Sequence, residues 1–153
     1  MATSANVVRG AFTSKYKDLP LLASIARYDA SPRVSHLVHP IRYIKAALDN
    51  PPNSESTCLL YRPPTPEFRV MQLRLDGQNA TAHFSSIESH WLLICTQGSG
   101  GITVKSSSGL EEGMLQFGSA FCVRRGADVA FTQAKEDPSQ SIVIFIASDG
   151  MED

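Results

Sequence analysis

The chain has 153 residues, of which 42% are hydrophobic and 19% are charged, and its formal net charge is −1. This composition is typical of a globular protein with one hydrophobic core, and it argues against a disordered chain. A charge so close to zero argues against nucleic acid or an anionic membrane surface as the main partner. No apolar run approaches the roughly 20 residues that cross a bilayer, so we expect no membrane-spanning segment.

The first predicted element is an extended basic segment, NVVRGAFTSKYKD, at residues 6–18. Residues of equal parity share a face of an extended chain, so Arg9 and Lys15 lie on one side and Val8 and Phe12 on the other. The apolar side can anchor on a core while the other side presents two cations. At about 3.3 Å per residue, a straight strand separates the two cations by roughly 20 Å, so one small ligand reaches both only if the chain bends.

A short helix is predicted next, because Asp18 can cap it and Pro20 suits its first turn. The stretch 29–56 is then broken repeatedly by prolines. Within this stretch we expect a second short helix at Pro40–Leu48, where apolar residues recur at helical spacing. We interpret residues 1–56 as an N-terminal strand, one or two short helices and a linker.

From Thr57 the hydrophobic period changes to two, which is typical of β-strands. The predicted strands are Thr57–Tyr61, Phe68–Leu75, Ala80–Phe84, His90–Thr96, Gly101–Lys105, Met114–Gln116, Ser119–Val123, Asp128–Thr132 and Ser141–Ala147. In Phe68–Leu75 the parity of the apolar residues changes, which predicts a β-bulge near Val70. Leu92–Cys95 and Ile142–Ile146 are apolar throughout and should be central strands. Short strands at hairpin spacing without helices predict a mainly β fold, with a double-sheet jelly roll at residues 57–153.

The sequence has three widely spaced cysteines, Cys58, Cys95 and Cys122, and they form neither a disulfide framework nor a C-x-x-C metal site. Cys95 and Cys122 lie in apolar runs, where a cysteine usually behaves as a small buried hydrophobe. The N-terminus has no charged region followed by an apolar one, as a signal peptide would. We therefore expect a reducing, cytoplasmic location.

A jelly roll of this kind is similar to the cupins, which hold a metal with a His-x-His plus Glu cluster and a later histidine. The turn of the second cupin motif fits the frame from Gly118 to Gly126. However, Arg124 stands where that motif has proline, and Val129 stands where it has histidine. A further cluster, His83, Glu88 and His90, does not match the spacing of the first motif. We expect no metal site in this chain.

Residues 6–18 resemble the "SDNVVRAGFTPKYKD" stretch of type I phosphomannose isomerases. The matching residues are Asn6, Val7, Val8, Arg9, Phe12, Thr13, Lys15, Tyr16, Lys17 and Asp18. Ala5, the inverted pair Gly10-Ala11, and Ser14 depart from the family pattern. The stretch YRPPTPEF at Tyr61–Phe68, followed by Arg69-Val70-Met71, is similar to the family's "Y-x-P-P-x-x-E-F-x-V" entry into its C-terminal β domain. The later apolar strands follow in the expected order.

This resemblance implies an enzyme that interconverts mannose 6-phosphate and fructose 6-phosphate with zinc. It implies that Arg9 is the catalytic cation beside the sugar and that Lys15 binds the phosphate end of the substrate. In the family the zinc ligands (two His, one Gln and one Glu) precede the arginine stretch. We therefore expect no cofactor in this chain, although zinc belongs to the full-length family. One arginine cannot supply the roughly 8 kcal/mol or more of enzymatic rate enhancement, so we expect the isolated chain to be inactive.

Three interpretations remain open from the sequence. The chain is the C-terminal portion of a phosphomannose isomerase, with a sugar phosphate and a missing N-terminal domain as partners. Alternatively, it is a stand-alone, metal-free jelly-roll module that binds a partner or small ligand, or that associates with itself. A degenerate paralogue is the third interpretation, to which Ala5 and Ser14 point.

Overall fold

The computed structural model of the chain describes residues 14, 16–26, 30–49, 55–134 and 141–149. The chain divides into two units, Met1–Leu37 and Val38–Asp153. The predicted N-terminal strand lies outside the described residues, apart from a few positions at its end. No described helix is long and apolar enough to cross a membrane.

The described part of the first unit contains the short helix α1, Leu19–Ile25, and the 3₁₀-helix η1, Arg33–His36. Asp18 caps α1 as predicted: its side chain accepts a hydrogen bond from the backbone N–H of Leu21 at 3.0 Å. Pro20 lies in the first turn, where its missing N–H costs nothing. None of the residues of α1 is buried.

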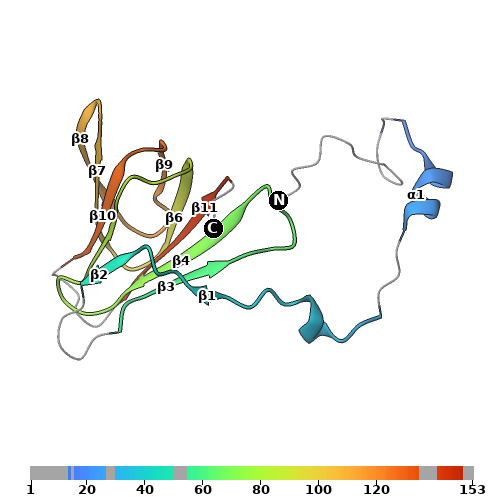
Figure 1. Cartoon of the computed structure of the whole chain (residues 1–153), viewed down its shortest axis with the longest axis horizontal. Helices are drawn as coiled ribbons and strands as arrows, with labels where there is room; N and C mark the ends of the chain where they lie inside the picture. The colour runs from blue at the N-terminus through green and yellow to red at the C-terminus, as the bar shows by residue number, and fades with distance from the viewer. Residues whose placement is uncertain (1–13, 15, 27–29, 50–54, 135–140, 150–153) are drawn as a thin grey trace. The chain divides into compact units, whose positions relative to one another are not determined.

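The second unit is a jelly roll of two antiparallel sheets (Figure 1). The larger sheet has the strand order β1-β3-β4-β11-β6-β9 and the smaller sheet the order β2-β5-β10-β7-β8. The strands are β1 Ile41–Arg42, β2 Ala47–Asp49, β3 Thr57–Tyr61, β4 Arg69–Leu75, β5 Thr81–Phe84, β6 Trp91–Gln97, β7 Gly100–Ser106, β8 Gly109–Leu115, β9 Ala120–Val123, β10 Asp128–Gln133 and β11 Ile142–Ser148. The predicted mainly β fold and jelly roll are confirmed.

Every strand predicted from residue 57 onward corresponds to a strand of the structure, and β3 has the predicted bounds. The largest difference concerns β8, which we expected only at Met114–Gln116. It begins at Gly109 and pairs along its whole length with β7. The first five residues of β8, GLEEG, show no alternation of apolar and polar residues. The reason is that β8 is an edge strand of its sheet and most of its side chains are exposed.

The predicted helix at Pro40–Leu48 is wrong, because this stretch forms β1 and β2 instead. Ile41 and Arg42 pair with β3, and Ala47–Asp49 pairs with β5. Cross-strand hydrogen bonds to both sheets outweigh a local helical period of only a few residues. The jelly-roll unit therefore starts at Val38, earlier than the predicted boundary at residue 57.

The predicted β-bulge near Val70 is also wrong. The pairing of β4 with β3 and with β11 continues without interruption from its first paired residue to its last. Phe68 lies before β4, so the apparent change of parity marks the start of the strand. The register shift of the larger sheet lies instead between Val143 and Ile144, where β11 pairs with β6.

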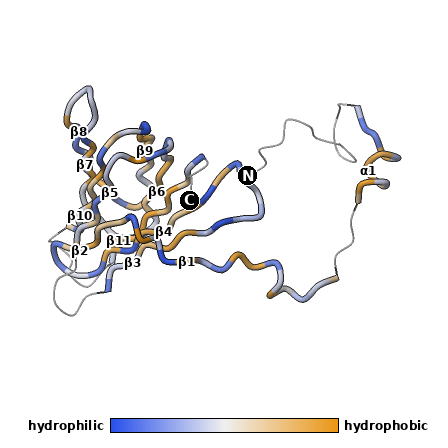
Figure 2. Tube along the Cα trace, viewed as in Figure 1, coloured by the Kyte–Doolittle hydropathy of each residue, from blue (hydrophilic) through white to orange (hydrophobic). Residues whose placement is uncertain are grey.

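The core between the two sheets contains a cluster of aromatic side chains. The ring of Phe84 contacts Trp91 and Phe131 edge to face, with centroids 5.0 Å and 5.9 Å apart. Apolar residues recur along the paired strands of both sheets (Figure 2). β11 lies between β4 and β6, as expected of a central strand. β6 is also an interior strand, but only its alternate residues, such as Leu93 and Cys95, are buried.

Candidate functional site

The two residues predicted from the basic segment, Arg9 and Lys15, lie outside the described residues. The described end of this segment comprises Tyr16, Lys17 and Asp18, and the side chain of Tyr16 is exposed. Arg9 as catalytic cation and Lys15 as substrate-binding residue therefore stay predictions.

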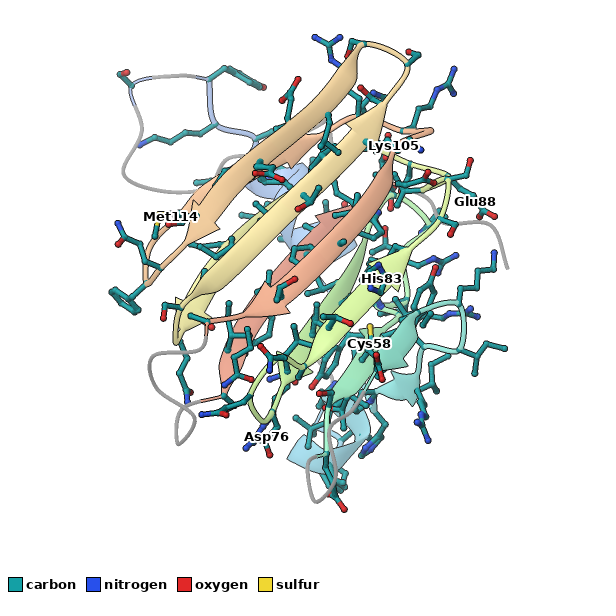
Figure 3. The ribbon with its side chains drawn as sticks, turned by 90° about the vertical axis from the view of Figure 1, so that its left-hand side faces the viewer. Cys58, Asp76, His83, Glu88, Lys105 and Met114 are labelled. Atoms are coloured by element: carbon teal, nitrogen blue, oxygen red, sulfur yellow. The ribbon has the colours of Figure 1, made fainter. Side chains whose placement is uncertain are left out.

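The side chains that we considered as metal ligands are held apart. His83 lies on the exposed outer face of the smaller sheet (Figure 3). The Glu88 carboxylate pairs with Lys45 Nζ at 3.0 Å, and His90 Nδ1 lies 3.9 Å from Asp149 Oδ2. Among the residues that the structure describes, no group of three His, Cys, Asp or Glu side chains could hold a metal ion.

The position of the cupin motif's later histidine is likewise unsuited to a metal. Gly118 and Gly126 have φ angles of +83° and +82°, a backbone conformation that glycine adopts without strain. The turns of the cupin motif are thus retained. Val129, at the position of the motif's histidine, is 1% exposed and packs in the core. A buried valine offers no lone pair, so the described residues do not fit zinc.

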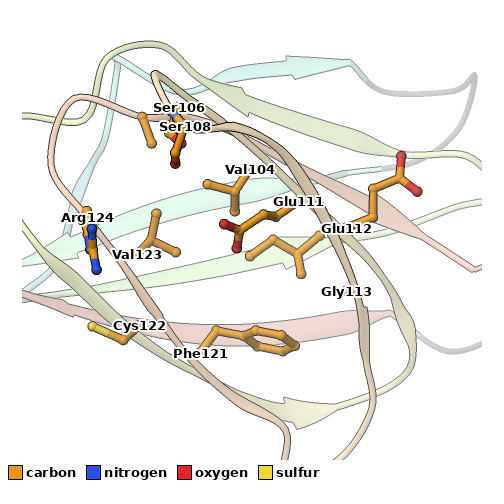
Figure 4. Close-up of a pocket in the computed structure, with 12 residues that line it drawn as sticks. Val104, Ser106, Ser108, Glu111, Glu112, Gly113, Phe121, Cys122, Val123 and Arg124 are labelled. Atoms are coloured by element: carbon orange, nitrogen blue, oxygen red, sulfur yellow. Dashed lines mark hydrogen bonds between the residues drawn. The ribbon is translucent and has the colours of Figure 1, made fainter.

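A pocket of about 330 Å³ opens where the two sheets end, beside their end strands β8 and β9 (Figure 4). Residues of the β7–β8 hairpin line one side, and residues of β9 and the β9–β10 turn line the other. The hairpin brings Val104 and Glu111 to the pocket, and the other side brings Phe121, Val123 and Arg124. The pocket therefore combines an apolar wall with polar and charged groups.

The strand register determines which of two adjacent glutamates faces inward. Glu111 pairs with Val104 and Glu112 pairs with Thr103. Paired residues share a face, so Glu111 lies on the side of Val104, which packs against the core, and Glu112 lies on the other side. Figure 4 shows the Glu111 carboxylate between Val104 and Phe121, while the carboxylate of Glu112 points away from them.

Gly113 creates room for the aromatic wall of the pocket. A Cβ atom at this position would lie 2.8 Å from Cε1 of Phe121 and 3.1 Å from Cγ2 of Ile102. Real Cβ atoms essentially never approach a ring so closely. The absence of a side chain at Gly113 therefore allows the Phe121 ring to occupy the pocket wall.

The polar groups of the pocket have few partners within the chain. Ser106 Oγ and Ser108 Oγ lie 2.7 Å apart, and either can be the donor. In the part of the chain that the structure describes, neither the Glu111 carboxylate nor the Arg124 guanidinium forms a hydrogen bond or ion pair within the chain. Their hydrogen-bonding capacity is therefore available to a ligand.

The sequence reasoning missed Glu111, although a signal existed. The strand at Gly101–Lys105 was predicted, and the sequence SSSG that follows it at 106–109 is typical of a turn. A two-residue hairpin there places Leu110 opposite Lys105 and hence Glu111 opposite Val104, as the structure has it.

The larger sheet presents a second feature, which we call the apolar outer face. It consists of two rows of directly paired residues: Tyr61, Val70, Ala147, Leu92 and Cys122, and then Leu59, Gln72, Phe145, Ile94 and Ala120. None of the ten is charged and none is buried, and Leu92 and Ile94 are 54% and 44% exposed. Five strands at about 4.8 Å spacing make the face roughly 19 Å wide.

Comparison with known proteins identifies relatives of the chain. Residues 58–107 match the family model described as phosphomannose isomerase type I C-terminal. The chain is 36% identical over its whole length to the mannose-6-phosphate isomerase of Aspergillus fumigatus, of which it covers 33%. It is 34% identical to the Saccharomyces cerevisiae enzyme over 65% of the chain and 22% of that protein. For the Bos taurus enzyme the identity is 30%, over 94% of the chain and 29% of that protein. The chain thus spans a third or less of the length of these relatives.

Solved structures support the fold. The vicilin from Solanum lycopersicum superimposes with a TM-score of 0.56 at 13% identity, covering 71% of this chain and 31% of that chain. The cupin domain of Schizosaccharomyces pombe Cnp3 superimposes with a TM-score of 0.51 at 13% identity, covering 65% of this chain and 64% of that chain. At such low identity the likeness concerns the fold alone, which is a cupin-like jelly roll.

Proposed function

This chain belongs to the type I phosphomannose isomerase family, and we propose that it serves as the C-terminal portion of an enzyme that interconverts mannose 6-phosphate and fructose 6-phosphate. The observation that carries the proposal is the 36% identity to the Aspergillus fumigatus mannose-6-phosphate isomerase, which extends over the whole chain. Because the match covers only a third of that relative, the activity itself belongs to the longer protein in this proposal.

In this function Arg9 is the catalytic cation. A guanidinium stays charged at all physiological pH values and binds oxyanions through two parallel hydrogen bonds. A fixed cation beside the reacting carbons stabilises the negative charge that develops during the proton shift. Lys15 binds the phosphate end of the substrate as a more flexible point charge. The metal of the family reaction has no place among the described residues, so we assign no step through it to them.

The jelly roll contributes an attachment surface in this proposal. The apolar outer face carries no charge, and a patch of this kind on a soluble protein marks an interaction site. Its occupant is the portion of the longer enzyme that this chain does not match, because the relatives are about three times as long. The alternative of a metal-free binding module without chemistry is favoured by the same face, and the two roles differ only in whether turnover follows association.

The location that we propose is the cytoplasm. Cys58, Cys95 and Cys122 are all free thiols. Thiols persist unpaired in reducing compartments, whereas secreted proteins of this size commonly oxidise them.

A reconstitution experiment tests the function. The chain is assayed for conversion of mannose 6-phosphate with added Zn²⁺, alone and after co-expression with the unmatched portion of the Aspergillus fumigatus enzyme. We expect turnover only in the combined sample. There, Arg9→Ala should lower kcat by about 10²- to 10³-fold, whereas Lys15→Ala should mainly raise KM.

Lys105→Ala is the matched control, because Lys105 is an exposed cation on the outer face of the smaller sheet. It should leave both kinetic constants unchanged. Turnover by the chain alone would contradict the proposal that activity requires the unmatched portion of the longer enzyme. An unchanged kcat in Arg9→Ala would show that Arg9 is not the catalytic cation.

A further inference from the structure

We propose that the pocket beside β8 and β9 binds a small, neutral, polyhydroxylated molecule of about the size of one sugar ring, with Glu111 as its principal hydrogen-bond acceptor. The proposal involves neither Arg9 nor Lys15, and the inference does not depend on the proposed function. It depends on the size, the wall and the unpaired polar groups of the pocket.

The size of the pocket limits the ligand. Small-molecule sites have volumes of roughly 300 to 1,000 Å³, and this pocket of about 330 Å³ lies at the lower end. A single small ring or a short polyol fits such a space, whereas a nucleotide or an oligosaccharide would extend into solvent. The pocket is open on one side, between the end strands of the two sheets, so a ligand can enter without unfolding the jelly roll.

One wall of the pocket is apolar. Val104 lies on β7, which pairs with β10, and Val123 lies on β9, which pairs with β6. The Phe121 ring packs against Gly113. A flat aromatic ring presents a face on which the C–H groups of a sugar or polyol can lie, and burying them there is favourable. Because Gly113 has no side chain, the Phe121 ring can lie against it and present its face to the pocket.

The inward carboxylate of Glu111 indicates that the ligand carries hydrogen-bond donors on the side away from Phe121. Glu111 occupies an inward-facing position where the alternation along β8 would otherwise place an apolar residue. An ionised carboxylate only accepts hydrogen bonds, at up to four lone-pair positions, and its neighbours Val104 and Phe121 donate none. Hydroxyl groups of a ligand supply the missing donors. Ser106 and Ser108 add two hydroxyls that can both donate and accept.

The charge of the pocket selects neutral ligands over phosphates. Glu111 places one negative charge on the inward side of β8, and Arg124 on the opposite side of the pocket supplies one positive charge. A phosphate near Glu111 would be repelled, so an unphosphorylated molecule is preferred. Arg124 can donate to ligand hydroxyls at the rim, because its guanidinium forms no other bond within the described chain.

The test is an NMR titration of the full 153-residue chain, with ¹⁵N labelling, against D-mannose, D-glucose, glycerol and inorganic phosphate. We expect the two monosaccharides to shift the amide signals of the β7–β8 hairpin and of Phe121 with dissociation constants on the order of millimolar. Glycerol should bind more weakly and phosphate should leave these signals unchanged.

Two variants of adjacent residues make the test specific. Glu111→Ala should weaken monosaccharide binding by at least about tenfold because it removes the acceptor. Glu112→Ala, one residue further along β8 and on its other face, should change binding by less than about twofold. Both positions are exposed, so the spectrum of each variant can be checked for an intact jelly roll before the titration.

Several results would overturn the proposal. The first is the absence of any shift at sugar concentrations of about 100 mM, well above the expected dissociation constant. Equal losses in the two glutamate variants would show that binding does not occur at the inward carboxylate. Tighter binding of phosphate than of monosaccharide would refute the preference for neutral ligands. None of these readouts involves isomerase activity, so failure here and failure of the proposed function are distinguishable.

Discussion

Single residues of this chain have chemical properties that follow from their place in the jelly roll, as its cysteines illustrate. Cys58 and Cys95 are completely buried, while Cys122 is exposed. Burial raises the pKa of the Cys58 thiol to about 12 and raises that of Cys95 too. Our expectation that Cys122 is a buried hydrophobe is wrong, because it lies on the outward side of β9. Only Cys122 should therefore react readily with thiol reagents in the folded chain.

The raised pKa of Cys58 predicts a loss of stability in alkali. The unfolded thiol ionises near pH 9 and the folded thiol near pH 12, so the unfolded chain releases its proton first as the pH rises. The contribution of Cys58 is thus fully present below about pH 8.5 and declines by up to about 1.4 kcal/mol per pH unit above it. Urea unfolding at about pH 8 and pH 10 measures this decline. Cys58→Ala should make it smaller, and Cys122→Ala should leave it unchanged. An equal decline in Cys58→Ala would contradict the assignment.

At the scale of elements, close packing between strands decides what each position tolerates. Gly100 and Gly101 are neighbours at the start of β7, and both pair with β8 and β10. A Cβ on Gly100 would overlap the backbone carbonyl oxygen of Thr132 and lie 3.0 Å from Ile142 Cδ1. A Cβ on Gly101 would meet only the carbonyl oxygen of Gly113, at 4.0 Å.

These two glycines give a paired prediction. Gly100→Ala should lower the free energy of unfolding by more than about 2 kcal/mol, because a backbone atom cannot move aside as a flexible side chain can. Gly101→Ala should change it by less than about 0.5 kcal/mol. Thermal and urea denaturation of the two variants measure the difference. Similar stabilities would show that the contact between β7 and β10 is looser than the structure has it.

At the scale of the whole molecule, the jelly roll has an apolar core and also an apolar surface that its described residues leave exposed. Leu93 lies in the core, whereas its neighbours Leu92 and Ile94 lie on the apolar outer face. An apolar strand of this kind buries one face in the core and exposes the other, which is the face that we propose a partner covers. The second row ends at the exposed Arg42 of β1, which pairs with Leu59, but the residues from β3 to β9 carry no charge and favour a partner with an equally apolar surface.

Substitutions along β6 test the proposal that the rest of a longer enzyme attaches to this face. Leu92→Lys and Ile94→Lys should leave the fold of the chain intact but reduce its association with the unmatched portion of the enzyme by at least about tenfold, because each buries an unpaired charge in the interface. Co-purification and analytical ultracentrifugation measure the association. Leu93→Lys is the contrasting variant and should unfold the chain. Normal association of Leu92→Lys would show that the enzyme attaches elsewhere.

The sequence by itself determined the jelly roll, most of the extent of its strands from residue 57 onward and the helix cap at Asp18. These features depend on the alternation of apolar and polar residues and on a capping side chain. Both are local patterns, so they can be recognised in a single sequence. It also indicated the family, through the basic segment and the stretch YRPPTPEF at Tyr61–Phe68. The roles of Arg9 and Lys15 stay predictions, because both residues lie outside the described part.

The tertiary structure alone decided the features that depend on partners distant in the sequence. Ile41 and Ala47 form strands rather than a helix because the edges of both sheets offer them backbone hydrogen bonds. Glu111 faces a pocket because its register with Val104 is set by the hairpin. Leu92 is exposed although it lies in a fully apolar run, because a strand buries one face and the chain's described residues leave the other uncovered. The local sequence pattern shows which residues alternate along a strand. The pairing of strands and the packing of the two sheets determine what lies against each face of that strand.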